Sequence, residues 1–512
     1  MSAGAPPLDA AALRWTLVAA ILGSSMAFLD GTIVNVALPA IQRDLGADAA
    51  QAQWVIESYA LFLAALLLVG GALGDHYGRR RVFMAGVALF TAAAAGCAAA
   101  PDAWGLIAAR AVQGIGAALL VPGSLALISA NFPDAQRGRA IGTWSAFSGI
   151  AAAVGPVVGG FLIDHSSWPW AFVINLPLGI ALLLVCRAKV PHDRPSADRT
   201  PLDLAGAVLG TVGLAGVVFA CIEAPGRDWT AVPVLAAGIA GAAALLAFAW
   251  TEARSPHPML PPALLRVRNF AGANLLTLLL YAALSGGLYF LPLNLIQVQG
   301  YSAAAAGSAL LPFVVILFLL SGWAGKLVDR IGSRTPLVVG PLIAAAGFAL
   351  FARPGIGLAY WRELFPAVCV LGLGMAITVA PLTTTVMNAV DGEHAGLASG
   401  INNAVSRTGG LLAIAVFGIL MASSFNSTLD SELARRAVPA ALRGEVQAQR
   451  HQLAALRVPA GTDAAAARAV EQAVGTAFVA GFRHVMLVCA ALALLSALSA
   501  WLLIGRGPAQ RP

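Results

Sequence analysis

The sequence predicts an all-α integral membrane protein of about fourteen transmembrane helices, arranged as two six-helix halves with two helices inserted between them. Composition is the first reason, because 59% of the 512 residues are hydrophobic, 11% are charged and the mean hydropathy is +0.81. A water-soluble globule cannot bury so much apolar surface. The second reason is that the apolar residues form runs of roughly 20, which suits helices crossing about 30 Å of hydrocarbon. The third reason is a motif that occurs twice.

The repeated motif occupies Gly71–Arg81 and Gly325–Arg334, each time between two apolar runs. In register, Gly71, Leu73, Asp75, Gly78 and Arg80 correspond to Gly325, Leu327, Asp329, Gly332 and Arg334. The basic Arg79 of the first copy is replaced by Ser333 in the second, so we expect the second copy to form weaker contacts. The motif marks equivalent loops in the two halves.

The apolar runs define the expected helices in chain order. The N-terminal half, residues 1–187, holds six of them, at 14–41, 53–74, 82–100, 104–129, 139–163 and 169–187. A linker, residues 188–268, holds the two inserted helices at 204–223 and 231–251. The C-terminal half, residues 269–512, holds the last six, at 269–292, 303–328, 335–353, 363–390, 396–423 and 482–504.

An even number of spans places both termini on one side, and the positive residues indicate which side. Lys and Arg concentrate in loops on the side of the termini, and such loops remain in the cytoplasm. We therefore expect both termini inside, and the net charge of +7 reflects topology rather than a nucleic-acid partner. The N-terminus lacks the pattern of a removable signal peptide.

One segment, residues 424–481, is too charged to span and lies outside in this topology. The spacing of Leu429, Leu433, Val446, Leu453 and Leu456 predicts amphipathic helix. The segment is either a solvated cap or a docking surface for a periplasmic adaptor protein.

Two acids inside apolar helices are the main candidates for chemistry, because a charge at a helix centre costs about 2.5–3.5 kcal/mol. Asp30 lies in the first helix with Asn35, where Gly31 and Pro39 favour a bend. Glu57 lies in the second helix, about one turn from its outer end. Burial disfavours the charged form of a carboxyl group, so either acid could exchange protons near neutral pH. The alternatives are a packing role for Asp30 and a snorkelling side chain for Glu57.

The fourth and fifth helices carry further candidates. Arg110 and Gln113 lie close together on the fourth helix, and a buried Arg requires an acid unless it snorkels to a boundary. The fifth helix carries residues that permit close approach and a bend, which suits either a hinge seam or static packing: Gly149, Gly155, Pro156, Gly159 and Gly160. In the second half we favour Arg407, with Asn403 beside it, among polar residues that otherwise indicate helix-to-helix hydrogen bonds.

The sequence lacks the patterns that are typical of several other classes of site. The five cysteines, at positions 97, 186, 221, 369 and 489, lack paired or metal-ligand spacing. No ATP-binding glycine loop, metal cluster or nucleophile–base set is present. We therefore expect no cofactor, no metal and no enzyme activity.

These motifs resemble those of the major facilitator superfamily, specifically its fourteen-helix drug:proton antiporters. Gly71–Arg81 resembles the loop signature after helix two, and Gly325–Arg334 resembles its partial second copy. Leu29–Pro39 resembles the first-helix signature of the group, and Arg110–Gly116 resembles the fourth-helix motif. Gly149–Gly160 is similar to the motif of exporters rather than importers.

The resemblance implies alternating access in a bacterial cytoplasmic (inner) membrane, with the glycine–arginine loop as a latch on the cytoplasmic side. It associates Arg110 with proton transfer and an acid at the place of Glu57 with recognition of cations. The expected function is export of amphipathic, often cationic, drugs or toxic compounds in exchange for protons. The alternatives are an exporter dedicated to one endogenous metabolite and a membrane sensor or assembly protein that transports nothing.

Overall fold

The computed structural model describes residues 10–191, 203–256, 258–357, 359–390, 395–459 and 461–505, apart from a few side chains within helices. Within these ranges the secondary structure is helical. Among the described residues, fourteen helices are long and apolar enough to cross a membrane, judged by length and composition. The predicted number of spans is confirmed.

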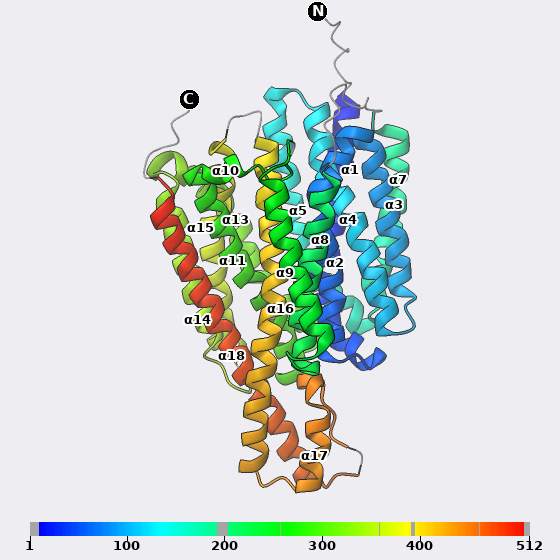
Figure 1. Ribbon diagram of the computed structural model, residues 1–512, viewed down its shortest axis with the longest axis vertical. Coiled ribbons are helices and arrows are strands. Elements are labelled where there is room, and N and C mark those ends of the chain that lie inside the picture. The colour runs from blue at the N-terminus through cyan, green and yellow to red at the C-terminus, as the bar shows by residue number, and fades with distance from the viewer. Residues whose placement is uncertain are drawn as a thin grey trace, which may run out of the picture.

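The first six spans pack together, drawn from blue to teal in Figure 1. They are α1 (Ala10–Leu45), α2 (Ala49–Tyr77), α3 (Arg79–Ala98), α4 (Ala103–Asn131), α5 (Asp134–His165) and the pair α6 (Trp170–Val173) and α7 (Asn175–Lys189). The sixth span, predicted as one helix at 169–187, is interrupted at Ile174. Pro177 explains this break, because it has no N–H to donate to the carbonyl of Val173.

The inserted helices α8 (Leu204–Arg227) and α9 (Val232–Glu252) lie against each other, and α8 contacts both halves. Val218 and Ile222 of α8 are buried in one cluster with Leu61 of α2 and with Leu411 and Ala415 of α16. The two inserted helices therefore belong to the packed bundle (Figure 1).

The remaining helices form the second group. They are α10 (Pro262–Arg266), α11 (Arg268–Leu293), η1 (Asn294–Val298), α12 (Ala303–Ser308), α13 (Leu311–Ile331), α14 (Arg334–Phe351), η2 (Tyr360–Leu364), α15 (Phe365–Asn388), α16 (Ala395–Arg435), α17 (Ala440–Ala448), η4 (Arg450–Ala455) and α18 (Ala464–Leu503). The span predicted at 303–328 is divided into α12 and α13, because Pro312 removes the bond to the carbonyl of Ser308.

Residues 424–481 form a cap, into which two of the spanning helices continue. Helix α16 continues to Arg435, and α18 begins at Ala464 rather than at the predicted 482, so both run beyond the bundle (Figure 1). The predicted amphipathic character is confirmed, because Leu429, Leu433 and Val446 are buried. Arg457 donates to the backbone oxygen of Arg43 at 3.4 Å, which ties the cap to the end of α1.

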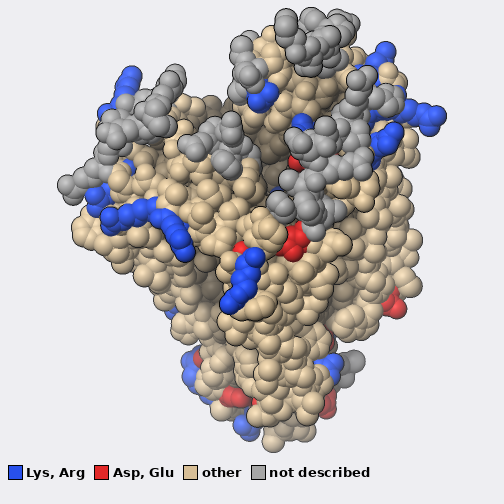
Figure 2. Space-filling model, turned by 45° about the horizontal axis from the view of Figure 1, so that its top comes forward, with Lys and Arg blue, Asp and Glu red and all other residues tan. Residues whose placement is uncertain are grey.

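The opposite end, where α1 begins and α18 ends, we call the terminal face (Figure 1). Lys and Arg side chains gather there, and the surface is hollowed between the two halves (Figure 2). The end that carries the cap we call the cap face.

The repeated motif lies at the terminal face and is more helical than predicted. Helix α2 runs through Gly71 to Tyr77, so the expected loop reduces to Gly78, whose φ of 102° breaks the helix before α3. Gly332, with φ of 74°, does the same between α13 and α14. A positive φ is easily adopted only by glycine, which explains why both copies need it.

Candidate functional site

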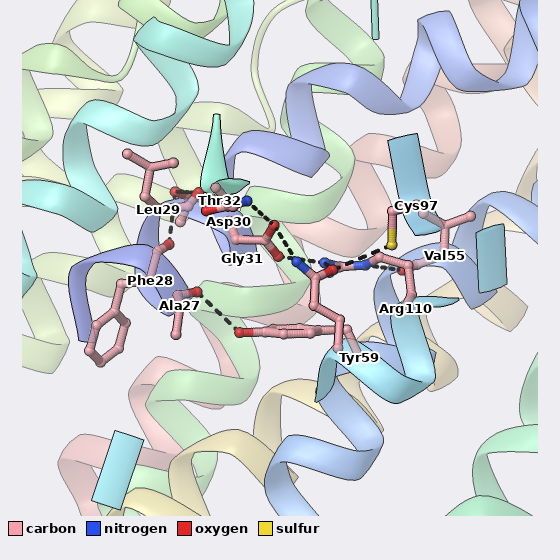
Figure 3. A network of polar contacts seen from close by, with 12 residues as sticks. Ala27, Phe28, Leu29, Asp30, Gly31, Thr32, Val55, Tyr59, Cys97 and Arg110 are labelled. Carbon is pink, nitrogen blue, oxygen red and sulfur yellow. Dashed lines mark hydrogen bonds and ion pairs between the residues drawn. The ribbon is translucent and has the colours of Figure 1, made fainter. Parts of the chain in front are cut away.

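A buried polar network centres on Asp30 in the middle of α1. Its side chain is fully buried and accepts three hydrogen bonds. Arg110 Nη1 of α4 lies 2.5 Å from Oδ2, while Gln113 Nε2 and Asn175 Nδ2 each lie 2.9 Å from Oδ1. Figure 3 shows the carboxylate pointing at the guanidinium. Three helices, α1, α4 and α7, therefore share one carboxylate.

Hydrogen bonds and an aromatic ring fix the position of the Arg110 side chain. It is 1% exposed, its Nε donates to the backbone oxygen of Val55 at 3.1 Å, and its Nη1 donates to Gln113 Oε1 at 2.8 Å. Its guanidinium lies 4.2 Å from the centre of the Tyr59 ring, which runs beneath it in Figure 3. The predicted pairing of Arg110 with an acid is confirmed, and the snorkelling alternative is wrong.

Glycines allow the helices to approach closely enough for these contacts. A Cβ atom on Gly114 would lie 2.5 Å from the backbone oxygen of Tyr59, so α4 packs against α2 only without one. Gly116 meets the backbone of Phe90 on α3 in the same way, at 2.6 Å. The sequence Arg110–Gly116 therefore combines the charge with the close packing that buries it.

Asn175, the third donor to Asp30, is a site residue that was not predicted. The sequence contained a pattern that could have identified it, because Asn175 is a polar amide within the apolar run of residues 169–187. It is fully buried at the start of α7, directly after the break at Ile174.

Glu57 lies deeper than predicted. It stands more than two turns into α2, its side chain is fully buried, and neither carboxylate oxygen has a hydrogen-bond partner among the described residues. The snorkelling alternative is therefore wrong. Tyr289 of α11 and Cys221 of α8 are its titratable neighbours, so Glu57 faces the second half and the inserted helix.

Helix α5 joins the halves near the cap face. Cβ atoms on Gly155 and Gly159 would lie 2.1 Å from Thr32 Oγ1 and 2.6 Å from Ile33 Cγ1, both on α1. Gly160 abuts the backbone of Ala303, and a Cβ on Gly307 would lie 2.1 Å from the oxygen of Pro156.

Asp164, also on α5, accepts from the backbone nitrogens of Ala303 and Ala304 at 3.0 and 2.8 Å and so caps α12. Gly149, by contrast, faces open space, so close packing does not explain that member of the motif.

The repeated motif holds its own half together at the terminal face. Asp75 pairs at 2.8 Å with Arg79, four residues along, and the two side chains are 54% and 33% exposed. Arg80 is buried and donates to the backbone oxygen of Cys186 at 2.8 Å, at the end of α7. In the second half Arg334 donates to the backbone oxygen of Trp501, near the end of α18, so the two arginines hold equivalent places. The side chain of Asp329 lies outside the described residues.

Three further candidates lie away from the Asp30 network. Asn35 makes a long contact, 3.5 Å, to the oxygen of Gly31 in its own helix. Asn403 is exposed and donates to Ser399 on α16. Arg407 lies between the halves, with its guanidinium 5.4 Å from the centre of the Phe28 ring of α1.

The comparisons with known proteins agree with this architecture. The family model described as Major Facilitator Superfamily matches residues 20–414, well over half of the chain. The chain belongs to this superfamily. It is 37% identical over 440 residues to the multidrug resistance protein Stp of Mycobacterium tuberculosis, covering 85% of this chain and 80% of that protein.

Two further relatives place this major facilitator protein among resistance and export transporters. It is 38% identical to the puromycin resistance protein pur8 of Streptomyces alboniger, covering 80% and 84% of the two chains. It is 33% identical to the tetracenomycin C resistance and export protein of Streptomyces glaucescens, covering 94% and 90%. The chain is a multi-pass membrane transporter of the drug-resistance group and not an enzyme.

Solved structures share the fold of this superfamily member. An auto-inhibited peptide transporter of the POT family superposes with a TM-score of 0.65 at 16% identity, covering 98% of both chains. An inward-facing bacterial homologue of the lysosomal transporter Spinster gives 0.61 at 18% identity, covering 96% and 98%. At these identities the likeness concerns the fold alone.

Proposed function

We propose that this transporter exports amphipathic, often cationic, organic compounds in exchange for protons, by alternating access. The observation that carries the proposal is the buried pair of Asp30 and Arg110, which joins α1 to α4. A carboxylate enclosed by an arginine and two amides is a group whose protonation changes the packing of three helices.

Protonation of Asp30 has a direct structural consequence. The ionised carboxylate accepts from Arg110, Gln113 and Asn175, and a proton on it removes the charge that compensates Arg110. The guanidinium must then find other acceptors, which shifts α4 relative to α1. A proton gradient supplies roughly 2.3 kcal/mol per charge per 100 mV for such a cycle.

Glu57 is the proposed contact for cationic groups. An ionised carboxylate buried without a partner is expensive by several kcal/mol, so Glu57 requires either a proton or a bound cation. Asp30 is already paired, which separates the two roles. Proton and substrate thus use different acids on neighbouring helices.

The orientation of the cycle follows from charge. We place the terminal face in the cytoplasm, because Lys and Arg gather there, and the cap outside (Figure 2). The boundaries 1–187, 188–268 and 269–512 then separate the two rocking halves from the inserted pair. The repeated motif would latch the cytoplasmic side when the halves close there.

The proposal is tested by dye efflux in inverted membrane vesicles. Transport should follow an imposed proton gradient and stop when a protonophore is added. Efflux that continues with the protonophore and with ATP present would contradict proton coupling.

Two alternatives predict different results in a panel of toxic compounds given to cells with and without the protein. An exporter dedicated to one metabolite would protect against one compound and its close analogues. The relatives named for puromycin and tetracenomycin C give this alternative its support. A sensor or assembly protein would protect against none.

A further inference from the structure

We propose that Arg407 is an anion-binding residue of the central site, and that it selects compounds carrying an acidic group beside an aromatic ring. This inference rests on the proposed export function and names a second substrate class for it. Glu57 accounts for cations, whereas nothing in the transport cycle described above uses Arg407.

Arg407 is half-buried and lies between the halves, where a ligand could contact it. It lies twelve residues into α16, about 18 Å along the helix, and near the middle of residues 396–423, the stretch expected to cross the membrane. Asn403, one turn nearer the terminal face on the same side of the helix, is exposed. The hollow of the terminal face lies between the same two halves (Figure 2).

Among the described residues, no ion pair neutralises the charge of Arg407. The ion pairs of the described residues use the carboxylates of Asp30, Asp75, Glu223 and Glu432, and none of them includes Arg407. Asp30 is occupied by Arg110. Glu57 is two residues from Tyr59 on α2, and such residues point about 200° apart, so Glu57 faces away from the side that Tyr59 presents.

Aromatic rings stand where the rest of such a ligand would lie. The Arg407 guanidinium faces the ring of Phe28 from the other half at 5.4 Å, and Tyr59 is its titratable neighbour. The Tyr59 ring is covered by Arg110, whose guanidinium lies 4.2 Å from the ring centre, so Phe28 is the ring beside Arg407. An anion bound at Arg407 would compensate its charge, and the ring system of that anion could lie on Phe28.

The geometry favours a carboxylate or a phenolate on a flat compound over a lipid phosphate. Lipid headgroups lie at the membrane surfaces, whereas Arg407 lies near the middle of its span. A guanidinium binds a carboxylate through two parallel hydrogen bonds, and such charge-assisted bonds are strong.

The test compares two dyes that share one ring system, fluorescein, which is an anion, and a rhodamine ethyl ester, which is a cation. The purified full-length protein is reconstituted in nanodiscs, and the dissociation constant of each dye is measured by fluorescence anisotropy. Arg407→Gln should weaken fluorescein binding by about tenfold or more and leave the rhodamine ester unchanged. Arg407→Lys should restore part of the loss.

Arg227→Gln is the matched control, because it removes the same charge from an exposed arginine that pairs with Glu223 near the cap face. It should change neither dissociation constant. Retained rhodamine binding shows that Arg407→Gln is folded. Equal weakening of both dyes, or a wild-type protein that binds the rhodamine ester and not fluorescein, would overturn the inference.

The binding result is independent of the transport result. Should efflux prove insensitive to the proton gradient while fluorescein binding still depends on Arg407, the proposed antiport fails and the anion site stands. Should the rhodamine ester be exported by the gradient while fluorescein binding ignores Arg407, the antiport stands and the anion site fails.

Discussion

At the scale of single residues, two buried acids of the transporter differ in their hydrogen-bond partners. Asp30 accepts three hydrogen bonds, whereas both oxygens of Glu57 lack a partner among the described residues. The same burial therefore has two outcomes. Arg110 stabilises the charged form of Asp30, whereas we propose that Glu57 binds a proton or a cation.

Replacing Asp30 by Asn should abolish proton-driven export of every substrate. An amide cannot take a proton, and the buried Arg110 loses its counter-charge, so we also expect a loss of about 3 kcal/mol in the free energy of unfolding. Exchange of labelled for unlabelled substrate without a gradient should persist, and its loss would show a role in binding instead. Asp102→Asn is the control, because Asp102 is an exposed cap of α4 and Asn also caps helices.

Replacing Glu57 by Gln should weaken export of cations and spare neutral compounds. The amide keeps the size of the side chain and removes the charge that a cation needs. Efflux assays with one cationic and one neutral dye measure the difference. Equal losses for both dyes would contradict the role we assign, and Glu445→Gln on the exposed cap surface is the control.

The sequence predicted both buried acids and most of the network around Asp30, but it did not predict every donor to Asp30. Charges in apolar runs are rare, which made Asp30, Glu57 and Arg110 visible. Asn175 is uncharged, and its importance comes from the break at Ile174 that turns α7 toward Asp30. A contact made by a change of chain direction cannot be read from helical spacing.

At the scale of elements, α5 and α12 form the tightest described contact between the halves. Gly160 and Gly307 let two backbones meet with no side chain between them. The sequence predicted a seam on α5 from its glycines and Pro156. It could not identify the partner, because Gly307 is more than a hundred residues away and belongs to no repeated motif.

Gly307→Ala should loosen this contact, since its Cβ would lie 2.1 Å from the oxygen of Pro156. We expect the free energy of unfolding to fall by about 1–3 kcal/mol, together with slower transport. Thermal unfolding in detergent and vesicle efflux measure the two effects. Gly149→Ala on the same α5 meets nothing within 4 Å and should be neutral or slightly stabilising.

The spans themselves were predictable and their interruptions were less so. Length and hydropathy locate fourteen helices, but whether a proline bends or breaks a helix depends on its neighbours. Pro39 lies inside the continuous α1, whereas the spans that contain Pro177 and Pro312 are divided. The repeated motif was predicted as a loop because its charges end an apolar run, yet α2 continues through them to Tyr77.

At the scale of the whole molecule, the halves are joined near the cap face and hollowed at the terminal face. Gln297 Nε2 of η1 donates to Gln42 Oε1 of α1 at 2.8 Å, beside the contact of α5 with α12. The alternating access that we propose requires these contacts to separate once in every cycle.

A disulfide between Gln42→Cys and Gln297→Cys should therefore stop transport, and a reductant should restore it. The experiment uses a variant without the five native cysteines, which are unpaired among the described residues. The control pair is Asp430→Cys with Gln447→Cys, which joins α16 to α17 within the cap, where the native side chains lie 2.9 Å apart. Continued transport with the first disulfide intact would contradict opening at the cap face.

Because α16 is long, a small tilt of this helix displaces the cap by a large distance. The helix has 41 residues, so it is about 60 Å long from the terminal face to the cap. A tilt of about 10° about its midpoint moves the far end by roughly 5 Å, more than the contact between Arg457 and Arg43 can span. A fluorophore attached to the cap would thus report the tilt of α16 in each transport cycle from a position beyond the bilayer.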